Sequence, residues 1–329
     1  MAIINLTPDS FSGDGILGAP DPERDSGARA RDGGHGGDGG YGGRGGRGGH
    51  DPVETAVSKA LAAVDSGATW VDLGPESSRP GAKPVTQDTE LERLVPVLKL
   101  LTQERAKRRL QQRGESFRIS VDTMKPAVMA IALAEGADMI NDVNGFRAPG
   151  AWQVAVNAPG ICLVHMSGSP STMQQRAFYP ESAGGVVGAV RRFFGERLEE
   201  GCAYGLDPTR VVLDPGIGFG KTLEHNLGLL RAIAELGRPG WPLPDQEYPI
   251  LIGASRKSMI GELTGKGVEE RCAGSIGAAL AAFETGAAIL RVHDVAETID
   301  ALRVYHACHR DSALPYRSST GGLLASAAR

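Results

Sequence analysis

The chain has 329 residues, 41% of them hydrophobic, and it carries a formal net charge of −4 with a pI near 6.0. A charge balance this close to neutral gives no general attraction toward nucleic acid or an anionic membrane surface, so we expect neither as a partner. The length allows two average domains or one large α/β barrel, and no apolar run approaches the length of a membrane span.

Eight short apolar runs recur along the chain, and a helical stretch follows each of them. The runs span residues 2–6, 69–73, 118–121, 138–142, 161–165, 211–214, 250–253 and 288–292. The segments between them, such as "DPVETAVSKALAAVDSGA", carry apolar residues at helical spacing. Alternating strands and helices predict a parallel sheet, and eight units predict a closed (β/α)8 TIM barrel. A doubly wound open sheet is the alternative, because periodicity does not show closure.

Two helices have recognisable start signals. Asp51 precedes Pro52, and Asp294 precedes "VAETI", so both aspartates are predicted to mark the start of a helix. The stretch 166–210 is longer than one simple crossover, so we expect it to hold an extra loop or helix.

Residues 13–50 differ from the rest of the chain, with runs such as "GGHGGDGGYGGRGGRGGH". Such a segment cannot bury enough apolar area to offset its ordering entropy, so we interpret it as a disordered loop insertion. It resembles RGG segments that bind RNA, but it is short and flanked by acidic residues, which favours a passive loop. We therefore expect one barrel domain over residues 1–312 that contains this insertion, and a C-terminal tail over 313–329.

The four cysteines lie far apart and show no spacing typical of a metal site. They are Cys162, Cys202, Cys272 and Cys308. We expect reduced thiols with packing roles, as in cytoplasmic proteins. The start "MAIINLTPDS" lacks the basic region of a signal peptide, which also favours a cytoplasmic location.

The stretch "VVLDPGIGFGKT" (211–222) ends like a phosphate-binding P-loop. However, Pro215 stands where that motif needs its first glycine, and proline removes a backbone N–H from the phosphate cradle. The dinucleotide fingerprint also fails, because Lys221 takes the place of its third glycine. The stretch therefore needs an explanation other than ATP or NAD binding.

Barrel enzymes place their chemistry at the C-terminal ends of the strands, and every predicted strand here ends on polar residues. These residues are Asn5, Thr7, Pro8, Asp9 and Ser10; Glu76, Ser77, Ser78 and Arg79; Asp122, Asn141, Asp142, His165 and Asp214; and Ser255, Arg256, Lys257, Arg291 and His293. Taken singly, most such aspartates cap helices and most such cations are solvated.

The joint pattern is more informative than any one of these residues. Acids and amides follow the third, fourth and sixth strands, whereas cations follow the seventh and eighth. Carboxylates and an amide suit a polar heterocycle with N–H donors, and Lys257, Arg291 and His293 suit an anion such as a diphosphate. The pattern therefore indicates a ligand with two chemically different parts.

Seven segments resemble the dihydropteroate synthase family in order and spacing. They are "MAIINLTPDSFS", "ESSRPGA", "SVDT", "INDV", "DPGIGFGKT", "GASRKS" and "RVHD". The resemblance covers nearly the whole chain apart from the glycine-rich insertion. It implies a (β/α)8 barrel that joins 6-hydroxymethyl-7,8-dihydropterin diphosphate to p-aminobenzoate, with 7,8-dihydropteroate and pyrophosphate as products in folate biosynthesis.

The resemblance also implies roles for individual residues. It assigns the pterin ring to Asp122, Asn141 and Asp214 with help from Lys257, the diphosphate to Arg291 and His293, and Mg²⁺ to Asn5. It assigns p-aminobenzoate to Pro8, Ser78, Arg79, Phe219 and Ser255, with Ser78 also near the pterin diphosphate and Lys221 structural. Asp122, Asp214, Lys257 and Arg79 are the expected catalytic residues.

Further expectations follow from the same family. The "TPDSFS" and "SSRPGA" segments resemble two mobile loops over the p-aminobenzoate site, and Pro75 stands where the family commonly has glycine. The homodimers typical of the family imply a homodimer here. We expect pyrophosphate to leave first, so that the arylamine traps a pterin-stabilised cation. A pterin-binding paralogue without turnover, a pterin-dependent methyltransferase barrel and an RNA-binding role for the insertion are the alternatives.

Overall fold

A computed structural model describes residues 1–7, 51–77, 81–111, 117–168, 178–238, 240 and 245–309. The predicted insertion over 13–50 and the tail over 313–329 lie outside these ranges. So do three expected site residues, Pro8, Ser78 and Arg79.

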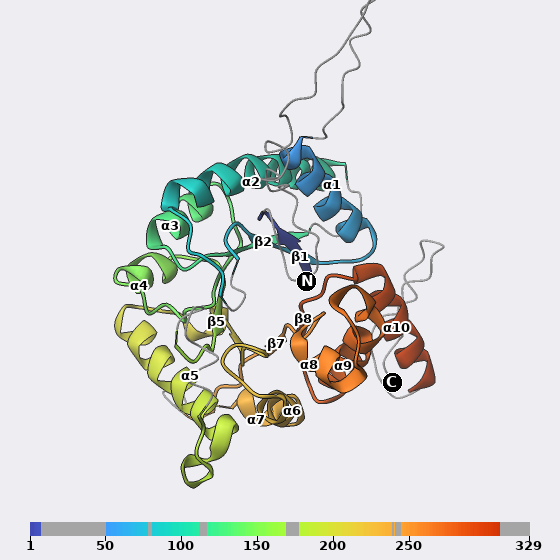
Figure 1. Ribbon diagram of the computed structural model, residues 1–329. Helices are drawn as coiled ribbons and strands as arrows, with labels where there is room; N and C mark the ends of the chain where they lie inside the picture. The colour runs from blue at the N-terminus through green and yellow to red at the C-terminus, as the bar shows by residue number, and fades with distance from the viewer. Residues whose placement is uncertain are drawn as a thin grey trace, which may run out of the picture.

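The strands of the described chain are the eight that the apolar runs predict. They are β1 (Ala2–Asn5), β2 (Trp70–Gly74), β3 (Arg118–Asp122), β4 (Met139–Asp142), β5 (Ile161–Val164), β6 (Val211–Asp214), β7 (Leu251–Ile252) and β8 (Ile289–Leu290). All pairings between them are parallel. The helices form a ring outside the strands (Figure 1).

The barrel is closed, although its strands belong to two ladders. β1 to β6 form one parallel sheet in sequence order, and β7 pairs with β8 in a second. A parallel bridge between Leu213 and Ile250 joins β6 to the second ladder, and another between Ala2 and Val292 returns to β1. The amide of Ile3 also donates to the Val292 carbonyl at 3.0 Å. These contacts confirm the TIM barrel and rule out the open sheet.

Helices follow the strands as the alternation predicts. They are α1 (Pro52–Asp65), α2 (Gln87–Leu110), α3 (Pro126–Ala134), α4 (Ala151–Ala155), α5 (Gly185–Ala203), α6 (Leu223–Arg231), α7 (Ile233–Leu236), α8 (Ser258–Thr264), α9 (Cys272–Glu284) and α10 (Val295–Cys308). Short 3-10 helices span η2 (Glu181–Ala183), η3 (Pro208–Arg210) and η4 (Val268–Glu270). The stretch 166–210 therefore holds extra structure besides α5, as its length predicts.

Alternate residues of the strands enter two different cores. On β5, Ile161 and Leu163 pack into the large core shared with the helices, whereas Cys162 and Val164 belong to a smaller cluster. Met139 and Leu251 join that smaller cluster from β4 and β7. Because side chains alternate along a strand, this second cluster fills the interior of the barrel. The interior of the barrel is therefore packed with side chains, so a ligand site is expected at the rim, where the strands end.

Both predicted helix starts are confirmed, since α1 begins directly after Asp51 and α10 directly after Asp294, but the two aspartate side chains are used differently. The carboxylate of Asp51 accepts from the amide of Val53 at 2.9 Å. Asp294 stands at the N-terminus of α10 but makes no side-chain capping bond. Its two oxygens instead accept from Arg256 Nε at 3.1 Å and Nη2 at 2.5 Å. A bidentate charge-assisted pair is stronger than one bond from a neutral amide, so the arginine wins.

None of the helices in the described ranges is both long enough and apolar enough to cross a bilayer.

Candidate active site

Two carboxylates contact the guanidinium of Arg291 at the C-terminal rim of the barrel, and an amide joins one of these carboxylates. Arg291 Nη1 donates to Asp72 Oδ2 at 2.7 Å and to Asp122 Oδ2 at 3.4 Å. The amide nitrogen of Asn141 donates to the same Asp72 oxygen at 3.3 Å. These residues come from β2, β3, β4 and the end of β8, so the strand exits converge as predicted. The cationic and acidic halves of the expected site are joined rather than separate.

The cluster has more negative than positive charge, and this perturbs its acids and bases. Burial first, and then the neighbouring charge of Asp72, raises the pKa of Asp122 to about 7. Burial alone would lower the pKa of Arg291, but the charges of Asp72 and Asp122 more than offset it and raise that pKa. Strongly perturbed groups that share one cleft are typical of functional sites.

Among the described residues, several buried polar atoms of the cluster find no hydrogen-bond partner. They are Asp72 Oδ1, Asn141 Oδ1 and Arg291 Nε. Native proteins rarely leave such atoms unmet, because each one costs free energy on burial. Two acceptors and one donor therefore mark this cluster as polar and incompletely satisfied, which is the chemistry that a ligand with both N–H groups and acceptors would match.

The segment after β6 turns sharply away from Asp214. Asp214 Oδ1 accepts from the amide of Gly216 at 2.7 Å, which fixes one carboxylate oxygen. Gly216 has φ of 68°, and a Cβ there would lie 1.9 Å from the carbonyl oxygen of His165. Only glycine can occupy this position, so the motif's glycines serve close backbone packing beside Asp214.

Lys221 holds together the segment 214–222 that follows β6. Its ammonium is buried and donates to the carbonyls of Gly216 and Phe219, each at 3.0 Å. It also lies 2.9 Å from His165 Nδ1. Burial, together with the charge of Lys221, lowers the pKa of His165 well below its ordinary value. Lys221 is therefore enclosed and structural, unlike the exposed lysine that a phosphate-binding loop requires.

Lys257 extends back over the same segment. Its ammonium donates to the carbonyl of Ile217 and lies 4.2 Å from the ring centroid of Phe219. Burial lowers the pKa of Lys257 to about 7, although the charge of Asp214 opposes this. The ring of Phe219 is only 5% exposed and belongs to the interior cluster, so Lys257 covers the aromatic face that the sequence analysis assigns to p-aminobenzoate.

Ser255 and His293 link the exits of β7 and β8. The hydroxyl of Ser255 lies 3.0 Å from His293 Nδ1 and accepts from the His293 amide at 3.2 Å. This pairing orients the imidazole of His293, which lies two positions after Arg291 in the chain. The two residues therefore share one location, as the sequence predicts, but they bind each other.

Two polar residues at strand ends are structural. Both carboxylate oxygens of Asp142 accept backbone amides, from Asn144 at 2.7 Å and from Phe146 at 2.8 Å. His165 is fixed by Lys221 and buried. Asp142 therefore stabilises the turn that follows β4, which is the common role of an aspartate at a strand end.

Asn5 lies apart from the acidic cluster. Its side-chain oxygen would be 3.6 Å from a Cβ placed on Gly74, so it lies over the neighbouring end of β2. Within the described residues, no group of three or more histidines, cysteines, aspartates and glutamates is arranged to hold a metal ion.

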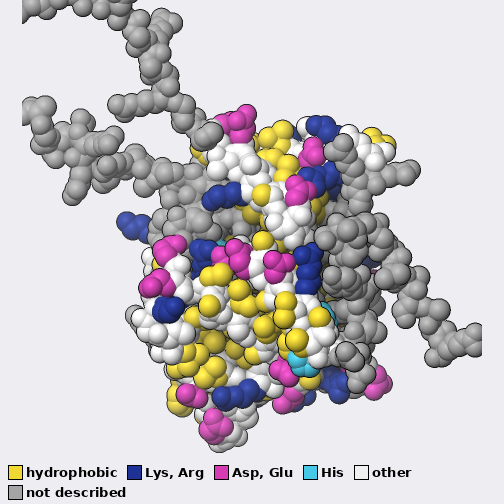
Figure 2. Space-filling view, turned by 90° about the vertical axis from the view of Figure 1, so that its right-hand side faces the viewer, with side chains coloured by type: hydrophobic (Ala, Val, Ile, Leu, Met, Phe, Trp, Pro, Cys, Tyr) yellow, Lys and Arg dark blue, Asp and Glu magenta, His cyan; other side chains and the backbone are white. Residues whose placement is uncertain are grey.

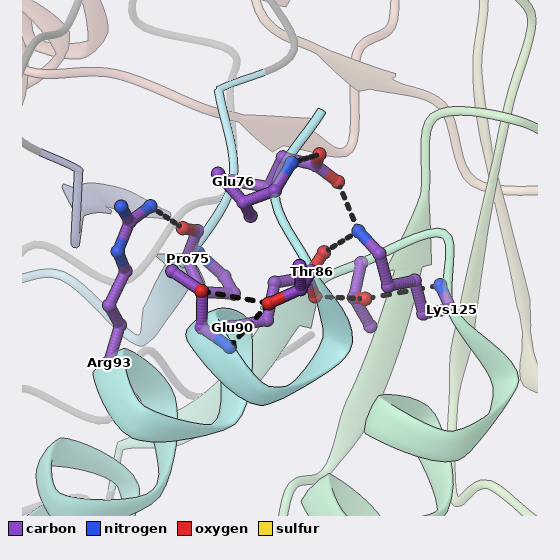
Figure 3. Close-up of polar contacts among 9 residues, drawn as sticks. Pro75, Glu76, Thr86, Glu90, Arg93 and Lys125 are labelled. Atoms are coloured by element: carbon purple, nitrogen blue, oxygen red, sulfur yellow. Dashed lines mark hydrogen bonds and ion pairs between the residues drawn. The ribbon is translucent and has the colours of Figure 1, made fainter. Parts of the chain in front are cut away.

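The sequence analysis overlooked two features of the site. Asp72 lies within the apolar run 69–73, and its charge there was the available signal, because burying an aspartate demands a partner. The second feature is an ion cluster in which Lys125 lies between Glu76 and Glu90 (Figure 3). Glu90 lies in the first turn of α2, where an acid is ordinary, so nothing in the sequence marked it.

Comparison with known proteins was made against families, curated sequences and solved structures. Residues 45–293 match the family model described as pterin binding enzyme. The dihydropteroate synthase of Escherichia coli strain K12 is 38% identical over 308 residues, which cover 93% of this chain and 90% of that protein.

Solved structures agree with the sequence relatives. The Burkholderia cenocepacia dihydropteroate synthase complexed with 7,8-dihydropteroate has a TM-score of 0.69 at 43% identity, covering 78% of this chain and 88% of that one. The Xanthomonas albilineans enzyme with 4-aminobenzoic acid has a TM-score of 0.71 at 37% identity, covering 95% and 93%.

Proposed function

The chain belongs to the pterin-binding enzyme family as a dihydropteroate synthase, and from this premise we propose which of its residues perform the reaction. It is a transferase that condenses 6-hydroxymethyl-7,8-dihydropterin diphosphate with p-aminobenzoate in folate biosynthesis. The unmet buried acceptors beside Arg291 are the observation that carries the residue assignment.

Asp122, Asn141 and Asp214 bind the pterin ring. The ring presents amino and ring N–H donors, and carboxylate and amide oxygens accept such donors. Asn141 Oδ1 is buried without a partner, and Asp214 has only one oxygen engaged, with the Gly216 amide. The ammonium of Lys257 donates to the carbonyl of Ile217, three positions after Asp214, and in the bound state it would donate to an acceptor on the ring instead.

The reaction exchanges one bond at the pterin methylene carbon. The C–O bond to the diphosphate breaks and its electron pair leaves with pyrophosphate. The amine nitrogen of p-aminobenzoate then forms the C–N bond and releases one proton. Asp122 and Asp214 stabilise positive charge on the pterin electrostatically, while Arg291 and His293 bind the departing diphosphate. Because an aniline is weakly basic, it is already unprotonated and needs no dedicated general base.

The residues present fit one Mg²⁺ bound largely by substrate. Magnesium commonly takes one or two protein oxygens and completes its shell with phosphates and water, so a cluster of acids is not required. The amide oxygen of Asn5 is such a ligand, and Gly74 leaves the space beside it free of a side chain. When bound, Mg²⁺ supplies charge neutralisation on the diphosphate.

The p-aminobenzoate site lies at the same rim. We assign it to Pro8, Ser78, Arg79, Phe219 and Ser255, with Ser78 also serving the pterin diphosphate and Arg79 the transition state. The hydrogen-bond contact between Ser255 and His293 supports an assignment in which Ser255 lies near the leaving group that His293 binds. Displacement of Lys257 from the Phe219 ring exposes an aromatic surface for the arylamine.

The enzyme forms homodimers in the cytoplasm. The outer side of α8 to α10 exposes two large apolar side chains among charged ones, Leu263 at 56% and Val304 at 64% exposure. Figure 2 shows a face on this side of the molecule, where hydrophobic side chains gather between charged ones. All four cysteines are free, which suits a reducing compartment. Light scattering of the wild type and of Val304→Glu tests the dimer, which a monomeric wild type would refute.

Pyrophosphate release tests the function directly. The purified chain is incubated with the pterin diphosphate, p-aminobenzoate and Mg²⁺, and each component is omitted in turn. Release that requires all three supports the synthase with its metal. Release that persists without Mg²⁺ in the presence of a chelator would refute the metal assignment. Pterin diphosphate binding without any release would instead identify a paralogue that has lost turnover.

A further inference from the structure

Glu76 closes the base of the segment that connects β2 to α2. One of its carboxylate oxygens accepts from the amide of Val85 at 2.8 Å, nine positions along the chain. At the start of the same segment, the carbonyl of Pro75 accepts from Arg93 Nη1 at 2.9 Å (Figure 3). The two ends of the segment are therefore held together, and both are held to α2.

Lys125 joins this base to the exit of β3. Its ammonium donates to the second oxygen of Glu76 at 2.8 Å and to Glu90 Oε1 (Figure 3). The other oxygen of Glu90 accepts from the hydroxyl of Thr123 at 2.7 Å. Thr123 directly follows Asp122 in the chain, and Lys125 lies three positions after it. One ammonium thus connects two otherwise separate parts of the rim.

The environment makes this cation difficult to replace. Glu90 is fully buried and the side chain of Glu76 is only 7% exposed, so two carboxylates shielded from solvent share the ammonium of Lys125, whose own side chain is 26% exposed. Burial raises the pKa of Glu90, although the hydrogen bond from Lys125 opposes this shift. Burial also acts to raise the pKa of Glu76, but the hydrogen bonds that Glu76 accepts from Lys125 and from the Val85 amide outweigh it, so that pKa is lowered. Without Lys125 the two acids would repel each other across this contact.

We propose that Lys125 is a positioning residue that sets the base of the segment between Glu76 and Val85 relative to Asp122. The inference rests on the proposed function, in which this segment serves p-aminobenzoate and Asp122 serves the pterin. Lys125 contacts no expected substrate group. It acts through Glu76 alone, and Glu90 with Thr123 holds it in place.

The chemistry makes such a device valuable. The amine and the methylene carbon must approach within about 3–3.5 Å in line, and a displacement of about 1 Å can cost on the order of 100-fold in rate. The two substrates are bound by different strand exits. A rigid ion contact between those exits keeps the arylamine in register with the pterin.

Three variants test the inference by steady-state kinetics and direct binding. Lys125→Met removes the link, Lys125→Arg keeps the charge, and Glu76→Gln keeps an acceptor for Val85 but loses the carboxylate that receives Lys125. Lys99→Met is the matched control, since Lys99 pairs with Glu135 at 3.3 Å on the exposed outer side of α2.

We expect Lys125→Met and Glu76→Gln to raise the KM for p-aminobenzoate about tenfold, while the Kd for the pterin diphosphate changes less than twofold. Lys125→Arg should recover most of the loss, and Lys99→Met should match the wild type. A wild-type KM in Glu76→Gln would overturn the proposal. So would an equal rise in KM and Kd, because that indicates general structural damage. If Lys125→Met does not fold, Glu76→Gln and Lys125→Arg still decide.

Hydrogen exchange separates this inference from the function beneath it. The amide of Val85 should exchange faster in Lys125→Met and Glu76→Gln than in the wild type and Lys99→Met, without any substrate present. Unchanged exchange overturns the positioning role even in an active synthase. Faster exchange in a chain whose wild type shows no turnover leaves the link standing and refutes the function instead.

Discussion

Arg291 Nη1 and Asp72 Oδ2, 2.7 Å apart, join the last strand of the barrel to the second across its interior. Both side chains are largely buried, so neither charge is compensated by water. The pair thus anchors the rim of the barrel beside Asp122, which Arg291 also contacts at 3.4 Å.

Replacing Asp72 with asparagine should destabilise the fold. Arg291 then keeps only the longer contact to Asp122, and breaking a buried pair from one side costs about 3–5 kcal/mol. Urea unfolding measures this cost. The control is Asp300→Asn, which removes an exposed pair with Arg303 and should leave the free energy of unfolding unchanged. Equal stability of the Asp72 and Asp300 variants would show that Arg291 needs no partner.

Asp122→Asn should lower turnover far more than it weakens p-aminobenzoate binding. The carboxylate stabilises positive charge that exists only as the C–O bond breaks, so kcat should fall on the order of 100-fold. The KM for p-aminobenzoate should change less than about threefold, since a group acting only in the transition state leaves ground-state binding intact. Steady-state kinetics decide this, and equal losses in both constants would exclude the cation-stabilising role.

The activity should depend on pH in a bell-shaped manner centred near neutrality. Burial and Asp72 raise the pKa of Asp122 to about 7, so its charged form accumulates as the pH rises through that value. Burial lowers the pKa of Lys257 to about 7, so its charged form is lost over the same range. The profile of kcat/KM for the pterin diphosphate reports both limbs. Asp122→Asn should abolish the acid limb, and a limb that persists must belong to another group.

The same carboxyl should make the fold less stable as the pH rises. Because the pKa of Asp122 is raised in the folded state, its contribution to stability is fully present below about 4 and is lost as the pH passes about 7. Asp122→Asn, which has no such penalty, should therefore melt a few degrees above the wild type at pH 8 but not at pH 4. Calorimetry at the two pH values checks this. A constant difference in Tm would contradict it.

Lys221→Met should unfold the segment 214–222 that follows β6. Because we expect this segment to bind no ATP, the variant should not change nucleotide binding. The change strands the carbonyls of Gly216 and Phe219, each costing about 1–3 kcal/mol when buried unpaired. We expect a loss of stability of about 3 kcal/mol in urea unfolding, against none for Lys99→Met. Detectable ATP binding by the wild type that this variant abolishes would mean that the lysine reaches a phosphate after all.

Much of the architecture could be predicted, because it depends on local pattern. The eight apolar runs coincide with the eight strands to within a residue or two at each end. Asp122, Asn141 and Asp214 could be picked out because a barrel brings all strand exits to one rim, whatever the details of packing. Lys221 could be assigned a structural role because Pro215 already excluded a phosphate cradle.

The rest depends on contacts between residues distant in the chain. Asp294 makes no side-chain capping bond because Arg256, which is 38 positions earlier, takes its carboxylate. Asp72 looks like an interruption of a strand until Arg291 is seen beside it. Glu90 reads as an ordinary acid in a first helical turn, although it is fully buried against Thr123 and Lys125. No periodicity encodes such partners.

On either side of β7 and β8 the strands are joined by an isolated bridge with its neighbouring main-chain hydrogen bonds rather than by a continuous ladder. Ser255, Lys257, Arg291 and His293 follow this short pair, whereas the carboxylates and the amide follow the long sheet. A ligand that contacts both sets of residues would connect the two ladders at the C-terminal rim of the barrel. We therefore expect ligand binding to stabilise the barrel. Without a ligand, the barrel should open first between its two ladders.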